Sequence, residues 1–164
     1  MSEKLSSQEV VEITAKYTFG TWRFQKNWKP IHVVDAEGVR FTDASGKQYL
    51  DFSSQLMCVT LGYKNQAVIK AIEEQARTLP YIAPGFATTV RAELSTLLLE
   101  VLPQGLEKFF FTTSGTDANE AAFKIARMVT GKTKIISRYH SYHGSTMGSI
   151  AATGDPRRWA MEPA

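Results

Sequence analysis

Apolar residues recur at helical spacing in several stretches of the chain, with polar residues between them. Ser6 and Glu9 have the spacing of a capping box at the start of the first stretch, and prolines close the second and third. We predict helices over residues 6–19, from Asn65 to Pro80, from Thr88 or Thr89 to Pro103, and from Ser114 to Gly131. In the last of these, Glu120 and Lys124 have the i,i+4 spacing of a favourable ion pair.

Three short β-like runs lie within "IHVVDAEGVRFTDASGKQYLDFSS", residues 31–54. The runs are separated by "DAEG" and "DASG", and each of these is an acid-to-glycine turn signal. The pattern predicts a small antiparallel meander. Together with the first helix, the meander forms a predicted N-terminal segment over residues 1–59, which we expect to be part of a small domain.

The pattern changes to strand, helix, strand from Lys108 onward, with the strands predicted at "KFFFTT" (108–113) and "KTKIISRY" (132–139). A βαβ rhythm with near-continuous apolar strands indicates an α/β domain whose mostly parallel sheet is covered by helices. We expect this larger domain to occupy residues 60–164 and to be incomplete, because only one or two strands of the sheet precede the end of the chain.

Composition narrows the class of protein. Among 164 residues, 43% are hydrophobic and 21% are charged, which is ordinary for a globular domain with one substantial core. No apolar run is long enough for a membrane span, and the N-terminus has no signal peptide pattern, so we expect a cytoplasmic protein. The net charge is +3 and the basic residues are scattered among acids, which argues against a nucleic-acid partner.

A single cysteine, Cys58, lies in the apolar run "QLMCVTLGY". One cysteine builds neither a disulfide framework nor a zinc site, and we expect a buried, inert thiol. We predict no metal site.

The junction "TTSGTDAN" suggests candidate chemistry. Ser114, Gly115 and Thr116 fall in the first turn of the predicted helix, where backbone N–H groups have no intrahelical partner and the helix dipole favours an anion. Gly115 has no Cβ to keep a ligand from the backbone, so the turn suits a phosphate group. The simpler interpretation is that Ser114 or Thr116 is only an N-cap and Gly115 only a tight turn.

A second cluster, "RYHSYHGSTMGS", follows the last predicted strand at residues 138–149. The ends of such strands are where α/β sheets place their ligand crevice. Tyr142 offers a flat face for a planar ring, and His143 offers a hydrogen-bond donor or acceptor. Ordinary packing of an aromatic loop is the alternative. A nucleotide-binding protein is disfavoured because neither glycine-rich nucleotide motif occurs.

The two clusters together resemble the signature of the class III aminotransferases, fold-type I pyridoxal-phosphate enzymes that include the ω-aminotransferases. "SGTDANEAAFKIAR" is followed about two dozen residues later by "YHGST", and "DAEGVRFTDASGKQYLDFSS" and "LGYKNQAVIKAIEEQ" are similar to the family's meander and following helix. The resemblance covers nearly the whole chain in order. It implies a fold-type I large domain and pyridoxal 5'-phosphate as cofactor.

The resemblance also implies roles for individual residues. The cofactor phosphate would be held around Gly115 and Thr116, next to Ser114, and the pyridine ring would stack on Tyr142, with His143 and Gly144 shaping the same pocket. Candidate substrate-binding residues are Leu56, Met57 and Phe86, the last of which would reach the site of a partner subunit, since the family forms homodimers.

Two protein groups that transamination requires have no counterpart among the residues of this sequence. The family's cofactor-binding lysine and the acid that pairs with the pyridine nitrogen lie beyond the point that matches Ala164. Lys124, Lys132 and Lys134 are interpreted as solvated charges. We therefore expect no catalytic residue in this chain. The chain alone would be inactive, and its expected partner is the remainder of the enzyme.

Three functional hypotheses follow. The first is an aminotransferase that moves an amino group from an ω-amine or amino acid to a 2-oxo acid such as pyruvate. An aminomutase or a decarboxylating transaminase of the same fold would share every motif seen here. The third hypothesis is a non-catalytic phosphate-ligand-binding or dimerisation fragment.

Overall fold

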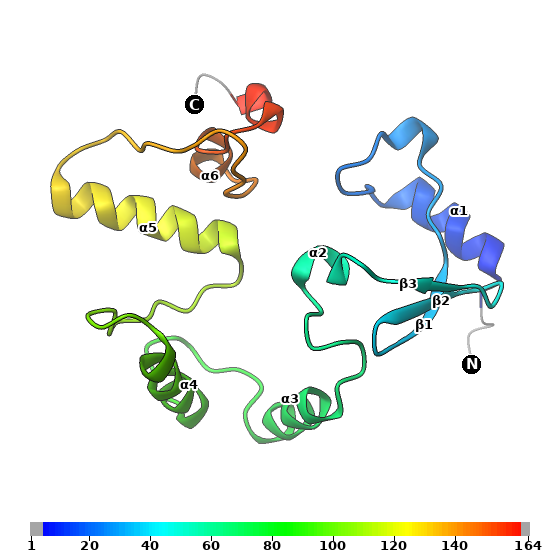
Figure 1. Cartoon of the computed structure of the whole chain (residues 1–164), viewed down its shortest axis with the longest axis horizontal. Coiled ribbons are helices and arrows are strands. Elements are labelled where there is room, and N and C mark those ends of the chain that lie inside the picture. Colours follow the sequence, from blue (N-terminus) through cyan, green and yellow to red (C-terminus); the bar gives the residue numbers. More distant parts are fainter. Residues whose placement is uncertain (1–4, 162–164) are drawn as a thin grey trace. The chain divides into compact units, whose positions relative to one another are not determined.

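The computed structural model describes residues 5–161. The chain divides into two compact units, Met1–Pro84 and Gly85–Ala164, which are called the N-terminal unit and the C-terminal unit below. Figure 1 labels the helices and strands of both units. The domain boundary near residue 60 stays a prediction.

The N-terminal unit begins with α1, Ser7–Tyr17, which is followed by the short 3-10 helix η1, Gln25–Asn27. The Ser6 side chain accepts a hydrogen bond from the Glu9 N–H at 3.3 Å, and the Glu9 carboxylate accepts one from the Ser6 N–H at 2.8 Å. These bonds satisfy N–H groups that lack an intrahelical partner. The predicted helix and its capping box are confirmed.

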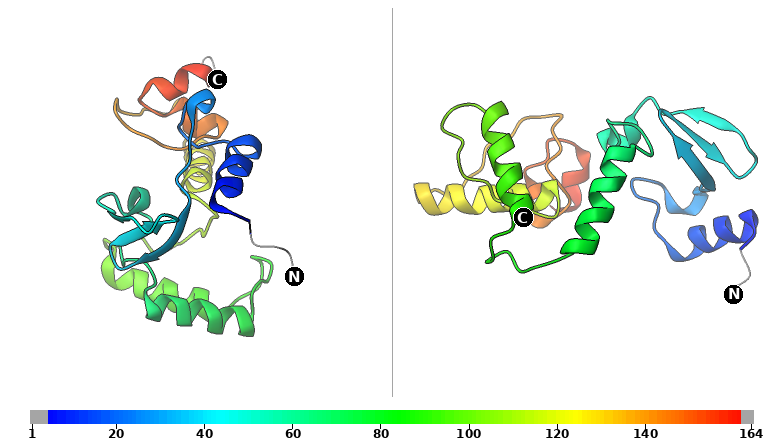
Figure 2. Two further views of the ribbon diagram at one scale, coloured as in Figure 1. Left: turned by 90° about the vertical axis from the view of Figure 1, so that its right-hand side faces the viewer. Right: turned by 90° about the horizontal axis from the view of Figure 1, so that it is seen from below.

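A three-stranded antiparallel sheet follows, in the order β1-β2-β3 (Figure 2). Its strands are β1, Val33–Glu37, β2, Arg40–Asp43, and β3, Gln48–Leu50. Phe41 and Tyr49 face each other across β2 and β3, with their rings stacked 5.0 Å apart. The predicted meander is confirmed.

The carboxylate of Asp43 organises the turn between β2 and β3. It accepts hydrogen bonds from the backbone N–H groups of Ser45 at 2.9 Å and Lys47 at 3.1 Å, and from the hydroxyls of Ser45 at 2.6 Å and Tyr49 at 2.8 Å. The hydrogen bonds from Ser45 and Tyr49 are the main cause that lowers the pKa of Asp43 to about 2. The turn therefore favours the charged carboxylate.

We expect the carboxyl carbon of Asp43 to titrate with a midpoint near its lowered pKa of about 2 in NMR spectra of the folded chain. Because the pKa is lower in the folded than in the unfolded chain, this group stabilises the fold fully above about pH 4, and the contribution is lost as the pH falls toward 2. A midpoint near the ordinary value of an aspartate would contradict the turn described here.

Two further helices close the N-terminal unit: α2, Ser54–Met57, and α3, Gln66–Thr78. The side chain of Asn65 accepts hydrogen bonds from the N–H groups of Ala67 at 3.1 Å and Val68 at 3.3 Å, as expected of an N-cap. The helix ends before Pro80, where the sequence predicted its end. The prediction for Cys58 is wrong, because its side chain is exposed.

The C-terminal unit contains α4, Thr89–Val101, α5, Gly115–Thr130, α6, Met147–Ala151, and the 3-10 helix η2, Pro156–Met161. Gly131 caps the end of α5 in the left-handed conformation, with φ of 68°, which favours glycine. The predicted bounds of α4 and α5 are confirmed. No helix within residues 5–161 is long and apolar enough to cross a membrane.

The two strands predicted at 108–113 and 132–139 do not form within the described residues. A strand requires a neighbouring segment that accepts and donates its backbone hydrogen bonds, and neither segment has such a ladder partner in residues 5–161. The two strand predictions are therefore wrong within the described residues: the apolar pattern is typical of a strand, but strand formation depends on a partner that the local pattern does not contain.

The expectation of one substantial core is wrong for the described chain. Its buried apolar residues are Ile150 and Ala152, which lie at α6 beside the buried Ser149 and Thr153. By contrast, Ile136 in the second apolar segment is 96% exposed. Most apolar faces therefore have no second layer packed against them, and burial is concentrated where α6 meets α5.

Candidate cofactor-binding site

The N-terminus of α5 is open at Gly115. Ser114 is the N-cap, because its side chain accepts a hydrogen bond from the Asp117 N–H at 3.3 Å. The carboxylate of Asp117 is engaged by the Thr113 hydroxyl. An added Cβ at Gly115 would meet no atom within 4 Å. The capping role of Ser114 is thus confirmed, and the first turn still offers backbone N–H groups without an intrahelical partner at an accessible glycine.

The second motif packs directly on the first. Gly144 is buried against Thr116, and a Cβ added at Gly144 would lie 2.1 Å from Thr116 Oγ1 and 2.9 Å from Ser149 Cβ. The φ angle of Gly144 is 139°, a conformation that other residues rarely adopt. Thr116 Oγ1 also lies 2.8 Å from Thr146 Oγ1. The structure therefore brings together the two motifs that the sequence singled out.

Two α5 side chains that sequence reasoning did not assign to the site fasten the loop to the helix. Asn119 Nδ2 donates to the backbone carbonyl of His143 at 2.6 Å. Glu120 Oε1 accepts hydrogen bonds from the Ser149 N–H at 2.8 Å and from the Thr146 hydroxyl. The latter bond is the largest cause that lowers the pKa of Glu120 below its usual range.

The predicted ion pair between Glu120 and Lys124 is absent from the ion pairs of the described residues. The carboxylate is used by the start of α6, where N–H groups lack intrahelical partners and attract a negative charge. These partners are 26 and 29 residues away in the sequence, so no local pattern pointed to them.

The aromatic loop is supported from behind by the end of α6. The His143 N–H donates to Thr153 Oγ1 at 3.1 Å, and Thr153 is fully buried. The Tyr142 hydroxyl lies 2.7 Å from Ser145 Oγ, while 42% of the Tyr142 side chain is exposed. The loop therefore fixes the ring of Tyr142 at its hydroxyl end and leaves part of it accessible.

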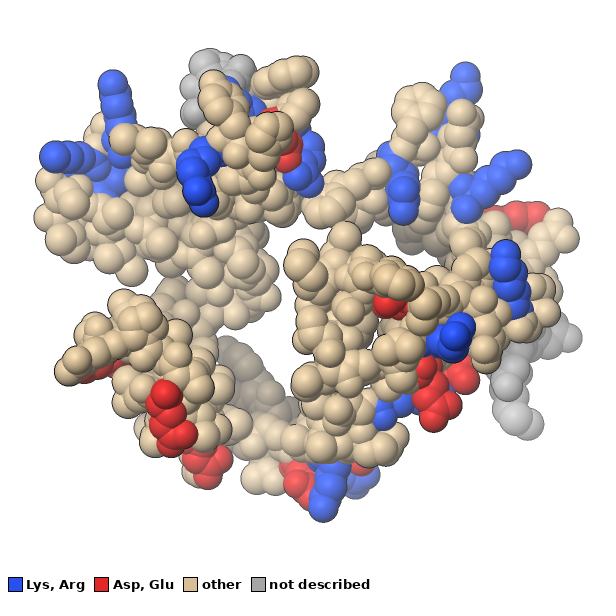
Figure 3. Space-filling view, viewed as in Figure 1, with Lys and Arg blue, Asp and Glu red and all other residues tan. Residues whose placement is uncertain are grey.

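Acidic and basic side chains are unevenly distributed over the C-terminal unit. On the face shown in Figure 3, acidic side chains lie over α4, whereas basic side chains lie over α5 and the segment that follows it. Lys124, Lys132 and Lys134 are exposed, as expected of solvated charges. No group of His, Cys, Asp and Glu side chains within residues 5–161 could hold a metal ion.

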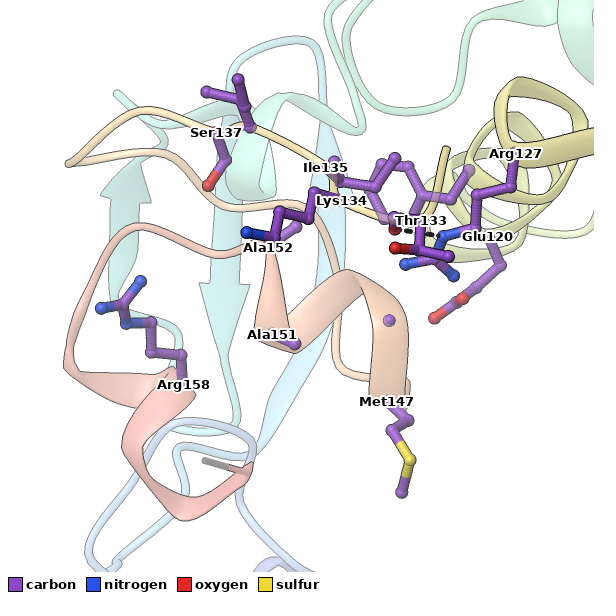
Figure 4. Close-up of a pocket in the computed structure, with 13 residues that line it drawn as sticks. Glu120, Arg127, Thr133, Lys134, Ile135, Ser137, Met147, Ala151, Ala152 and Arg158 are labelled. Atoms are coloured by element: carbon purple, nitrogen blue, oxygen red, sulfur yellow. Dashed lines mark hydrogen bonds between the residues drawn. The ribbon is translucent and has the colours of Figure 1, made fainter. Parts of the chain in front are cut away.

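A groove of about 590 Å³ lies between α5, residues 133–137 and α6 (Figure 4). Glu120 and Arg127 line it from α5, and Arg127 Nε donates to the carbonyl of Thr133 at 2.8 Å across one end. None of the predicted site residues lines this groove. The open first turn of α5, rather than the groove, is therefore the candidate site.

Two of the three predicted substrate-binding residues belong to the N-terminal unit. Leu56 and Met57 belong to the N-terminal unit, in α2, where residues 54–57 form a left-handed turn with φ between 47° and 67°. Left-handed backbone costs about 1–2 kcal/mol for each residue that has a Cβ. Phe86 belongs to the C-terminal unit and is exposed, and its carbonyl accepts a hydrogen bond from Arg91. The roles of these three residues stay predictions.

Comparison with known proteins places this geometry in a family. The family model "Aminotransferase class-III" matches residues 23–162. The acetylornithine aminotransferase of Mycolicibacterium smegmatis is 42% identical over 135 residues, which are 82% of this chain and 34% of the relative. The taurine–pyruvate aminotransferase of Bilophila wadsworthia is 34% identical over 157 residues, 92% of this chain and 34% of the relative.

Solved structures agree with the sequence relatives. The taurine:2-oxoglutarate aminotransferase of Bifidobacterium kashiwanohense, in complex with PLP and glutamate, matches with a TM-score of 0.91 and 40% identity over 98% of this chain and 36% of its own. An (S)-enantioselective ω-transaminase from Thermomicrobium roseum matches with a TM-score of 0.89 and 32% identity, over 99% of this chain and 39% of its own. The predicted fold class is confirmed.

The chain spans about a third of the length of the curated relatives that it matches. Within that span the family model covers both the meander and the cluster of Thr116 with Gly144. The chain therefore belongs to the class-III aminotransferase family.

Proposed function

We propose that this chain holds the cofactor of a pyridoxal-phosphate-dependent transaminase. The observation that carries the proposal is the contact of Gly144 with Thr116, because it joins the open first turn of α5 to the loop that bears Tyr142. A helix N-terminus suits a phosphate, and an accessible aromatic ring beside it suits a planar heterocycle. Pyridoxal 5'-phosphate has both groups.

The residues present fit that cofactor. The backbone N–H groups of Gly115 and Thr116 would hold the phosphate, and the absence of a Cβ at Gly115 leaves room for its oxygens. The ring would stack on Tyr142, with His143 and Gly144 forming the adjoining wall. Ser114 orients the turn as its N-cap. When bound, the cofactor supplies the electron sink that transamination needs.

The residues of this chain bind and orient in this proposal, and they do not move the proton. Lys124, Lys132 and Lys134 are exposed and lie outside the cluster of Thr116 with Gly144. We infer that the lysine that bonds to the cofactor, and the acid that pairs with the pyridine nitrogen, belong to the remainder of the enzyme. This chain alone would then be inactive.

The proposed reaction moves an amino group from an ω-amine or amino acid to a 2-oxo acid such as pyruvate. Support comes from relatives named as taurine–pyruvate and acetylornithine aminotransferases and from neighbouring ω-transaminase structures. Leu56, Met57 and Phe86 are the proposed substrate contacts. A homodimer and a cytoplasmic location complete the proposal.

Two other functions share the same cluster. An aminomutase or decarboxylating transaminase would use the same phosphate and ring contacts and would differ in the reaction completed elsewhere in the protein. A non-catalytic binding or dimerisation fragment would keep the contacts without the lysine. A lysine-bearing segment that accompanies this chain would distinguish a catalyst from such a fragment.

Binding of two probes to the chain tests the cofactor assignment. Inorganic phosphate reports on the first turn of α5, and pyridoxamine 5'-phosphate reports on the turn and the ring together without an aldehyde that would react with exposed lysines. We expect pyridoxamine 5'-phosphate to bind more tightly than phosphate in isothermal titration calorimetry. Replacing Tyr142 by alanine should lower the affinity for pyridoxamine 5'-phosphate by about tenfold, because one aromatic stacking contact is lost. The affinity for inorganic phosphate should be unchanged.

The matched control is Tyr139→Ala, because Tyr139 is an exposed tyrosine of the same segment that the proposal does not use. Its affinity for both probes should equal that of the unmodified chain. Equal losses in the Tyr142 and Tyr139 variants would count against the ring assignment, and an unmodified chain with no preference for pyridoxamine 5'-phosphate would refute it.

A further inference from the structure

We propose that Arg157 is a positioning residue that holds the ring of Tyr142 ready for a stacked ligand, and that Asp155 holds Arg157 in turn. The inference rests on the proposed function, because Tyr142 is the proposed ring contact. It adds residues from the segment after α6, which neither the sequence motifs nor the comparison assigned to the site.

The guanidinium of Arg157 lies over the ring of Tyr142, with its central carbon 4.2 Å from the ring centroid. This distance is well within the range of a cation–π contact, in which the planar guanidinium stacks on the aromatic face. Tyr142 remains 42% exposed with Arg157 in this position. The contact therefore supports the ring and leaves part of it accessible.

Asp155 fixes the position of that guanidinium. Arg157 Nε donates to both carboxylate oxygens of Asp155, at 2.9 and 3.0 Å, and Nη2 donates to the same carboxylate. The Arg157 N–H adds a further bond to Asp155 at 2.9 Å. Bonds from Arg157 are the largest cause that lowers the pKa of Asp155 to about 2, so the pair stays charged at neutral pH.

The segment that carries this pair is fastened to the segment that carries Tyr142. The His140 N–H donates to the Gly154 carbonyl at 2.9 Å, and the Gly154 N–H donates to the Ser141 carbonyl at 2.8 Å. A Cβ at Gly154 would lie 2.0 Å from the Arg138 carbonyl oxygen, so only glycine allows this approach. The backbone bonds to Gly154 therefore hold the segment of Arg157 beside the segment of Tyr142, and Asp155 holds the guanidinium itself.

These contacts hold Tyr142 at two places before any ligand binds. Ser145 lies at hydrogen-bond distance from its hydroxyl, and Arg157 lies over its face. A side chain that is already ordered loses less conformational freedom when a ligand stacks on it, and affinity rises accordingly. The pair of Asp155 and Arg157 should therefore raise the affinity for the ligand's ring and have no effect on the affinity for its phosphate.

Titration of the whole chain with the same two probes tests the inference. We expect Arg157→Ala to lower the affinity for pyridoxamine 5'-phosphate by about fivefold, which is the scale of one cation–π contact at a partly exposed site. Binding of inorganic phosphate should be unchanged, which also shows that the first turn of α5 is still folded. Arg157→Lys should also lower the affinity for pyridoxamine 5'-phosphate, because an ammonium group keeps the charge but cannot stack on the ring as a planar guanidinium does.

Arg158→Ala is the matched control, since it removes the same charge one residue further on. It should leave the affinity for both probes unchanged. Equal losses in the Arg157 and Arg158 variants would assign the effect to net charge and overturn the inference, and so would an unchanged affinity in Arg157→Ala. Tighter binding in Arg157→Ala would overturn it too, because Arg157 would then be a competitor for the ring.

The two proposals fail separately. In one outcome, the unmodified chain prefers pyridoxamine 5'-phosphate, Tyr142→Ala removes this preference, and Arg157→Ala does not reduce it. The cofactor assignment then stands, and only the role of Arg157 is wrong. If the unmodified chain shows no preference for the ring-bearing probe, the cofactor assignment and the role of Arg157 both fail.

Discussion

Gly115→Val should weaken binding of both phosphate and pyridoxamine 5'-phosphate by about ten- to a hundredfold, the loss of one or two hydrogen bonds to a charged group. The isopropyl group would stand where the phosphate oxygens approach the first turn of α5. Apart from its chain neighbours and the backbone of α5 itself, no protein atom lies within 4 Å of the position of its Cβ, so the variant should fold like the unmodified chain. Calorimetric titration with both probes measures the effect.

Gly85→Val is the control for this result. Gly85 lies in the same unit and precedes α4 rather than α5. Apart from its chain neighbours, no protein atom lies within 4 Å of an added Cβ there. Its affinity for phosphate should be unchanged. If Gly115→Val bound phosphate as tightly as the unmodified chain, the first turn of α5 would not be the phosphate site.

Gly144→Ala should destabilise the C-terminal unit by about 2–4 kcal/mol, through overpacking and a left-handed backbone at a residue with a Cβ. The added methyl group would lie 2.1 Å from Thr116 Oγ1 and 2.5 Å from Thr116 Cβ, and φ at this position is 139°. Thr116 cannot easily retreat, because its hydroxyl is bonded to Thr146 and its carbonyl accepts from Ser149. Urea denaturation followed by circular dichroism gives the free energy of unfolding.

Gly105→Ala separates the two causes of that loss. Gly105 also has a positive φ, 94°, but an added Cβ there would meet nothing within 4 Å. The variant should therefore lose only about 1 kcal/mol, the cost of the backbone conformation. Equal losses at Gly105 and Gly144 would mean that the contact between Gly144 and Thr116 is not tightly packed.

The helices were predictable because the signals that start and end them act within a few residues. The capping box of Ser6 with Glu9, the N-cap Asn65 and the left-handed Gly131 all make their bonds inside or next to their own helices. The open first turn at Gly115 was predictable for a similar reason, since it depends only on the residues at the start of α5.

The errors concern features whose partners are distant in sequence. Glu120 was paired with Lys124 by spacing, yet its carboxylate bonds to Thr146 and Ser149. Residues 108–113 and 132–139 have apolar patterns typical of strands, but a strand needs a neighbour, and no described segment serves as one.

Burial was overestimated for the same reason. The thiol of Cys58 and the side chain of Ile136 are apolar enough to be buried, and both are exposed. Burial depends on a second layer of structure against the apolar face. This chain, which spans about a third of its curated relatives, does not supply such a layer for most of its faces. Composition alone therefore predicted a core that the described residues do not form.

The most direct test of the account is to locate the lysine that bonds to the cofactor. The purified protein would be incubated with pyridoxal 5'-phosphate, reduced with borohydride and analysed by denaturing intact mass and peptide mapping. We predict one cofactor adduct per site, on a lysine outside this 164-residue sequence, with Lys124, Lys132 and Lys134 unmodified at stoichiometric cofactor. A stoichiometric adduct on one of those three lysines would contradict the assignment of this chain as the phosphate- and ring-binding part of a transaminase whose cofactor-bonding lysine lies elsewhere.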